Sequence, residues 1–204
     1  IRSAGEAWLA MGMLVLAAAY SVTHLGYWPF LRDCVNVMDK GNWGLFGLYA
    51  AVLWAVALVG LPWVMLAAAA LGTRLADRDS LSPWQTMLAS TGALVPMGLL
   101  AWIAFVVPML MVNVSFVRQS LSDPFGWGWD LLGAANTPWH QLWPSAIPWI
   151  QVGCILLGLG YSLRNAWRIW LGLTADPRAA LRGLLPLALL LVALAGALVW
   201  FYAD

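Results

Sequence analysis

Residues 44–70 read GLFGLYAAVLWAVALVGLPWVMLAAAA, an apolar run without a charged side chain. The hydrocarbon core of a bilayer is about 30 Å thick, and a helix needs about 20 such residues to cross it. This run therefore predicts a membrane-spanning helix. Four further runs have the same character and predict four more helices, at residues 8–25, 86–114, 146–163 and 183–202.

The composition of the whole chain agrees with this interpretation. Of its 204 residues, 63% are hydrophobic and 9% are charged, whereas soluble domains have about 45–50% apolar and about 25% charged residues. A formal net charge of +1 excludes a nucleic-acid-binding protein. We therefore predict an all-α, polytopic membrane helix bundle of about five transmembrane helices, in which residues 1–204 form a single integral membrane domain in contact with lipid.

Basic residues are divided unequally between the two sides of the predicted bundle. One side has three, which are Arg32, Lys40 and Arg118. The other side has seven, which are Arg2, Arg74, Arg78 and, in the predicted connection between the last two helices, Arg164, Arg168, Arg178 and Arg182. The positive-inside rule then predicts a cytoplasmic N-terminus and an outer C-terminus. The run at residues 8–25 lacks a signal-peptide cleavage pattern, so we expect a membrane helix there.

Pro62, Pro96 and Pro108 interrupt the apolar runs. Proline has no N–H, and its ring removes one hydrogen bond from a helix. Within a membrane such a residue is tolerated where a neighbouring helix satisfies the freed carbonyl group. We therefore expect the third apolar run, which Pro96 and Pro108 interrupt, to be bent or tilted, and we interpret the prolines as packing kinks rather than gating hinges.

The predicted outer loop, residues 115–145, is rich in tryptophan. It contains Trp127, Trp129, Trp139 and Trp143. Indole prefers the boundary between membrane and water, so an interfacial belt is one interpretation. Because the tryptophans gather on one side, the second interpretation is a surface of aromatic faces that holds a flat ligand such as a quinone or a haem edge.

Three ionisable side chains on the same predicted side are candidate site residues. His24 and His140 are the only histidines in the chain, and two imidazoles could ligate a haem iron or a copper ion. The alternative is two independent histidines at the membrane surface. Asp130 follows Trp129 and could accept a proton from a quinol, or it could serve as an ordinary solvated loop residue.

Several functional classes lack the residues that they need. The five predicted spans contain no charged side chain, which excludes an ion-coupled transporter or proton pump that works alone. The chain has no Walker A, G-x-S-x-G or H-E-x-x-H motif. With two cysteines and no C-x-x-C motif, it cannot hold an iron–sulfur cluster or a structural zinc ion by itself. We therefore assign no catalytic or metal-ligating residue.

The segment DPFGWGWDLLGAANTPWHQLWP at residues 123–144 is followed by an apolar helix that ends in YSLRNAWRI at residues 161–169. These segments resemble the closing membrane part of the NosR/NapH-like polyferredoxin-type electron-transfer proteins. The resemblance implies a role in electron transfer, although the family's Cys-rich cluster motifs are absent here. Residues 126–130, GWGWD, also resemble the end of the WWD loop in haem-handling cytochrome c maturation proteins.

The leading hypothesis from the sequence is a membrane subunit of a respiratory-type electron-transfer complex, more plausibly non-catalytic than an enzyme in itself. It would anchor extrinsic redox subunits at its outer face and line a quinone site there, in a bacterial inner membrane. The candidate cofactor-binding residues are His24, His140, Trp127, Trp129, Trp139, Trp143 and Asp130. Two alternatives stay open, namely a haem- or metal-delivery assembly factor and a permease or structural scaffold subunit.

Overall fold

The computed structural model of the chain describes residues 3–25, 29–78, 80–134, 136 and 138–203. The elements in chain order are α1 (Ala4–Leu25), α2 (Pro29–Val35), α3 (Val37–Lys40), α4 (Trp43–Ala55), the π-helical turn η1 (Val56–Gly60), α5 (Leu61–Leu75), α6 (Pro83–Thr91), α7 (Leu94–Ser122), the 3₁₀ turn η2 (Pro144–Ala146), α8 (Ile147–Thr174) and α9 (Pro177–Ala203). No described residue lies in a β-strand.

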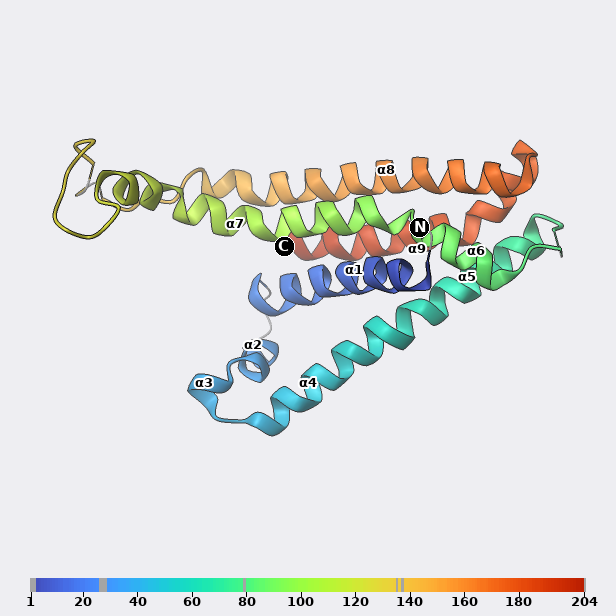
Figure 1. The fold of residues 1–204 in the computed structure, drawn as a ribbon, viewed down its shortest axis with the longest axis horizontal. Coiled ribbons are helices and arrows are strands. Elements are labelled where there is room, and N and C mark those ends of the chain that lie inside the picture. The colour runs from blue at the N-terminus through green and yellow to red at the C-terminus, as the bar shows by residue number, and fades with distance from the viewer. Residues whose placement is uncertain (1–2, 26–28, 79, 135, 137, 204) are drawn as a thin grey trace.

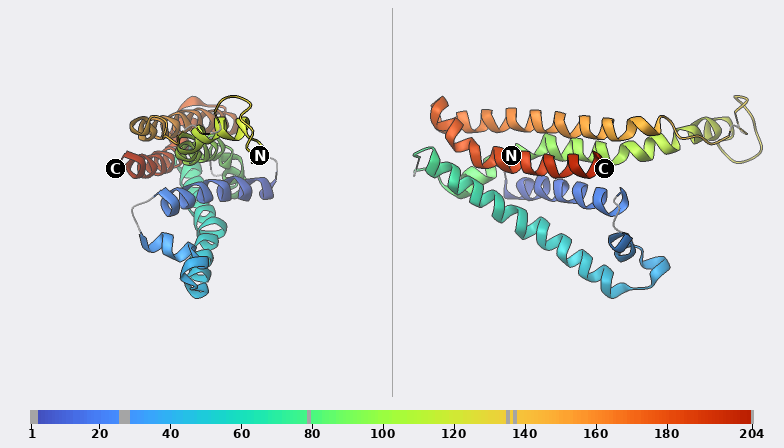
Figure 2. Two further views of the ribbon diagram at one scale, coloured as in Figure 1. Left: turned by 90° about the vertical axis from the view of Figure 1, so that its left-hand side faces the viewer. Right: turned by 180° about the vertical axis from the view of Figure 1, so that it is seen from behind.

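Five helical segments are long and apolar enough to span a membrane, which confirms the predicted all-α bundle. They are Ala4–His24, Trp43–Leu75, Pro83–Ser122, Pro144–Thr174 and Pro177–Tyr202. α7 lies against α8 and α1, α8 lies against α9, and α5 packs on α9. In Figure 1 the α7–α8 pair continues past the ends of α1 and α9, while α4 leaves the bundle at an angle. The right-hand view in Figure 2 shows the same arrangement from behind.

The bundle has two distinct ends. The start of α1 and the α5–α6 and α8–α9 connections lie at one end, on the right of Figure 1, and we call it the arginine-rich end because it includes Arg74, Arg78, Arg178 and Arg182. The opposite end carries α2, α3 and the long α7–α8 connection, and we call it the loop end. Its described basic residues are Arg32, Lys40 and Arg118.

The predicted boundaries were too short at several helix ends. α8 continues through Arg164 and Arg168 to Thr174, so these arginines lie on a helix and not in a connection. α9 begins at Pro177 rather than residue 183, and α7 continues to Ser122, which shortens the Trp-rich loop to residues 123–143. Arginine and glutamine are good helix formers, so the change from apolar to polar residues does not end a helix.

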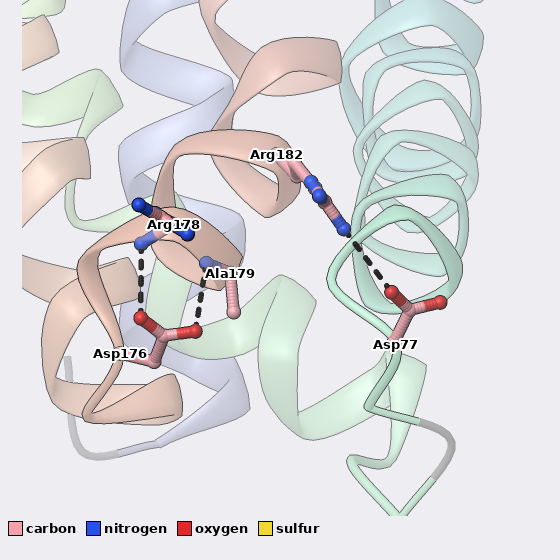
Figure 3. Close-up of polar contacts among 5 residues, drawn as sticks. All are labelled: Asp77, Asp176, Arg178, Ala179 and Arg182. Atoms are coloured by element: carbon pink, nitrogen blue, oxygen red, sulfur yellow. Dashed lines mark hydrogen bonds and ion pairs between the residues drawn. The ribbon is translucent and has the colours of Figure 1, made fainter.

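Backbone chemistry ends α8 and begins α9. Ala175 adopts the left-handed conformation at φ 55° and terminates α8. The Asp176 carboxylate then accepts hydrogen bonds from the backbone N–H groups of Arg178 at 3.1 Å and Ala179 at 3.3 Å, which caps α9 (Figure 3). Beside this turn, Arg182 pairs with Asp77 of the α5–α6 connection at 3.3 Å.

The three prolines in the apolar spans are each matched by a polar side chain from another helix. Pro62, Pro96 and Pro108 cannot donate to the carbonyl oxygen four residues earlier. In all three cases a side chain donates to that oxygen instead. The pairs are Trp8 Nε1 with the Leu58 oxygen (3.1 Å), Asn165 Nδ2 with the Gly92 oxygen (2.9 Å) and Gln151 Nε2 with the Ala104 oxygen (3.0 Å). The carbonyl groups that these prolines leave free are therefore satisfied by neighbouring helices.

Trp170 is the anchor of the arginine-rich half of the bundle. Its indole is 1% exposed and lies between two glycines, Gly72 of α5 and Gly183 of α9. A Cβ atom on Gly72 would lie 2.7 Å from the Trp170 ring, and one on Gly183 would overlap the same ring. Glycine at both positions therefore lets α5, α8 and α9 converge on one large side chain.

Candidate functional site at the loop end

Three aromatic rings form a cluster in the α7–α8 connection, and we call Phe125, Trp127 and Trp129 the aromatic tip. The ring centroids of Phe125 and Trp127 are 4.9 Å apart, and those of Trp127 and Trp129 are 5.0 Å apart with nearly perpendicular planes. Although they contact one another, the three residues remain 63%, 67% and 42% exposed. The tip is therefore an ordered apolar surface that faces outward.

Two side chains at the end of α7 hold the tip in place. Ser122 Oγ donates to Asp130 Oδ1 at 2.6 Å and accepts from the backbone N–H of Leu132 at 3.1 Å. The Asp123 carboxylate accepts from the backbone N–H groups of Trp127 at 2.9 Å and Gly128 at 2.8 Å. Both carboxylates thus shape the loop, and Asp130 has a structural contact in addition to its position beside Trp129.

Glycines allow the sharp path of this loop. Gly126, Gly128 and Gly133 adopt positive φ angles of 67°, 80° and 64°, a region that residues with a side chain rarely enter. The sequence also predicts a short helix at residues 128–135. This prediction is wrong, because the described residues of that stretch form turns, bends and irregular backbone and no helix.

Trp139 and Trp143 do not belong to the aromatic tip. They lie in residues 138–143, the part of the loop that leads back to α8, which we call the return arm. Trp139 Nε1 donates to the Val112 carbonyl oxygen at 2.9 Å, and the backbone N–H of Leu142 donates to the Met111 carbonyl oxygen at 3.0 Å. These bonds fasten the arm along α7. Trp143 is exposed and adopts a positive φ of 41° just before η2. Among the described residues, no ring contact joins either tryptophan to the tip.

The structure does not join the two histidines. His24 lies at the end of α1, where its ring stacks on Tyr20 with centroids 5.2 Å apart and meets the edge of Phe105 on α7. His140 lies on the return arm, and its Nδ1 is 3.4 Å from the Pro138 carbonyl oxygen. No contact among the described residues links the two rings. The same residues contain no group of three or more His, Cys, Asp or Glu side chains that could hold a metal ion.

A polar hollow lies beside the aromatic tip. Its volume is about 360 Å³, and it is lined by Gln119, Ser120, Asp123, Gly128, Trp129, Asp130 and Asn136. Of the residues predicted from the sequence, the structure brings together Trp127, Trp129 and Asp130. It places Trp139, Trp143 and His140 on the adjacent arm and His24 on a different helix.

A larger groove lies between α1, α4 and α9, and no pattern in the sequence predicts it. It measures about 730 Å³, and its walls are almost entirely aliphatic. Tyr49 lines it from α4 and shares a hydrogen bond of 2.9 Å with Thr23 of α1, close to the loop end. α4 itself has no fully buried residue. A helix that is apolar on every side gives no sequence signal for the face that borders a groove.

No protein-family model matches the chain, and no curated protein or solved structure matches it either. The resemblance to the NosR/NapH-like proteins therefore rests on the sequence segments alone.

Proposed function

We propose that the chain is a membrane subunit of a respiratory-type electron-transfer complex in a bacterial inner membrane, and that its aromatic tip anchors an extrinsic redox subunit. The observation that carries this proposal is the tip itself, an exposed cluster of Phe125, Trp127 and Trp129 in mutual contact. Tryptophans held in place before binding are typical centres of protein–protein interfaces, because little side-chain entropy is lost on docking.

The position of the tip supports docking rather than a lipid belt. From Phe105, which His24 contacts at the end of α1, α7 continues for about 25 Å of helix rise to Ser122. The exposed apolar face of α7 includes Val114 and Val117, and the charged Arg118 follows. The tip comes after Arg118 in the chain, beyond the predominantly apolar part of this helix. By the positive-inside rule, the loop end faces away from the cytoplasm.

The test is co-purification of the complex from its native membrane. We expect Trp127→Ala combined with Trp129→Ala to release a subunit whose reduced-minus-oxidised spectrum identifies a redox centre. Trp63→Ala is the control, because Trp63 is as exposed as Trp127 but lies on α5. The proposal fails if no redox-active subunit accompanies the unmodified chain, or if the double variant retains that subunit in full.

The groove between α1, α4 and α9 extends the proposal to a quinone. Its aliphatic walls suit an isoprenoid chain, and the hydroxyl groups of Tyr49 and Thr23 offer a hydrogen-bond donor to a quinone oxygen. The loss of one such bond costs about 1 kcal/mol, which is about fivefold in affinity. We therefore expect Tyr49→Phe to weaken quinone binding about fivefold, while Tyr161→Phe on α8 leaves it unchanged. Equal quinone binding by both variants would remove the quinone from the proposal.

No described contact favours the other two hypotheses. Haem or metal delivery by a histidine pair requires His24 and His140 to approach each other, and their observed contacts involve different neighbours. A permease would place a polar pathway within the bundle. The polar groups that bridge the helices, such as those of Asn165 and Gln151, are instead bonded to the carbonyl groups that proline leaves free.

A further inference from the structure

Two arginines lie on the flank of a membrane-spanning helix. Arg164 and Arg168 are one turn apart on α8, so their side chains share a face. The helix continues to Thr174, which places them about 15 Å and about 9 Å before its end at the arginine-rich side. Both are exposed on the outside of the bundle. Charged groups at such a depth are costly beside lipid unless they reach an anionic partner or the membrane surface.

A groove adjoins the two arginines on the surface between α7 and α8. Its volume is about 470 Å³. Its surface is almost entirely apolar, and α7 and α8 line it with Val95, Pro96, Leu99, Leu100, Tyr161, Arg164, Asn165 and Arg168. The Asn165 amide, which donates to the Gly92 carbonyl oxygen at 2.9 Å, fixes α8 against the start of α7 at this point. The site is therefore an apolar channel with two exposed arginines on the part of α8 that is nearer the arginine-rich end.

Neither guanidinium group is paired with another described part of the chain. Over residues 3–25, 29–78, 80–134, 136 and 138–203, no hydrogen bond or ion pair involves the side chain of Arg164 or Arg168. Two carboxylates at this end are engaged elsewhere, since Asp77 pairs with Arg182 and Asp176 caps α9 (Figure 3). Two adjacent positive charges thus face the surroundings of the helix bundle.

We propose that this groove binds an anionic phospholipid, whose phosphate group contacts Arg164 and Arg168 and whose acyl chain lies along Leu99 and Leu100. Guanidinium groups form bidentate hydrogen bonds to phosphate oxygens, which suits a pair of arginines one helical turn apart. The apolar channel adjoins the two arginines, so the site matches a headgroup joined to a chain better than a free anion. Basic sites on the cytoplasmic side of membrane proteins attract anionic lipids for the same electrostatic reason.

The experiment measures lipid binding by the purified full chain. In phosphatidylcholine nanodiscs, native mass spectrometry during titration with phosphatidylglycerol reports the preference for the anionic lipid. We expect Arg164→Gln combined with Arg168→Gln to reduce this preference about tenfold, which corresponds to about 1.4 kcal/mol. Arg74→Gln combined with Arg118→Gln removes the same charge from other exposed positions and should leave the preference nearly unchanged.

Two further measurements separate the sources of the anion. Inorganic phosphate should not displace the lipid, and Leu99→Gln, which makes the channel polar, should weaken phosphatidylglycerol binding although both arginines remain. Displacement by millimolar phosphate would overturn the proposal in favour of a free-anion site. An equal loss of preference in both arginine double variants would also overturn the proposal. An unchanged preference in Arg164→Gln/Arg168→Gln would overturn it as well.

Discussion

The hydrogen bond between Gln151 and the Ala104 carbonyl group gives the sharpest test of how this bundle is held together. Gln151 is 5% exposed and donates from Nε2 to the oxygen that Pro108 leaves without a helical partner. Replacing Gln151 with leucine keeps a similar volume but removes the donor. The Ala104 oxygen then stays buried without a hydrogen bond, in a region where no water can replace it.

The expected cost follows from two measured ranges. Leaving a buried carbonyl group unpaired costs about 1–3 kcal/mol in soluble proteins. Hydrogen bonds between membrane helices average about 0.6 kcal/mol and reach about 1.7 kcal/mol. Because Ala104 is fully buried and a proline excludes the usual helical donor, we expect a value near the upper membrane figure, about 1.5 kcal/mol for Gln151→Leu.

Pro108→Ala provides the decisive second change. An alanine restores the backbone N–H that can donate to the Ala104 oxygen, so Gln151→Leu should cost about 0.5 kcal/mol or less in this background. Pro62→Ala is the matched control, since the oxygen at that proline is bonded by Trp8 and not by Gln151. The free energies of unfolding can be measured by steric trapping in bicelles. An equal cost of Gln151→Leu in the unmodified and Pro108→Ala chains would refute this account.

Two other substitutions have predictable outcomes. Gly183→Ala should destabilise the bundle by about 1–3 kcal/mol, because the added Cβ atom overlaps the Trp170 ring. Gly196→Ala on the same helix is the control, because its Cβ atom meets open space and should be tolerated. Thermal unfolding in detergent compares the two variants, and equal melting temperatures would contradict the packing described. Ser21→Ala should cost about 1 kcal/mol and increase hydrogen exchange at the end of α9, because it removes the 2.6 Å bond to the Tyr202 hydroxyl. Unchanged exchange there would show that this bond does not secure α9.

The number and order of the spanning helices could be predicted from the sequence, whereas several of their ends could not. Hydropathy indicates where the side chains change from apolar to polar, and on α8 this change occurs after Leu163. The backbone hydrogen bonds continue to Thr174, where the left-handed Ala175 and the cap formed by Asp176 end one helix and begin the next. Lipid preference and helix termination have different physical causes, so one does not locate the other.

The candidate site shows a similar division. A turn at Asp123 was predictable, because an aspartate before a proline favours one, and the carboxylate does bond to the loop backbone. The separation of the two histidines along the bundle axis was not predictable. His24 lies at the end of α1 and His140 lies in the loop after α7, so their separation depends on how far α7 extends beyond α1. The donors that satisfy the proline-freed carbonyl groups had a usable signal, because Gln151 is a polar residue within an apolar run. The sequence alone could not assign that residue to Pro108.

The absence of any fully buried residue along α4 has a mechanical consequence. The described hydrogen bonds from this part of the chain to α1 are made by Tyr49, in the middle of α4, and by Leu58, in η1 beyond its end. Most side chains of α4 are exposed to the surroundings of the bundle, which in a membrane are hydrocarbon tails. Bilayer thickness therefore enters the energy of the segment directly, since a thinner membrane favours greater tilt of an apolar helix. The groove between α1, α4 and α9 would widen or narrow as the surrounding lipid changes.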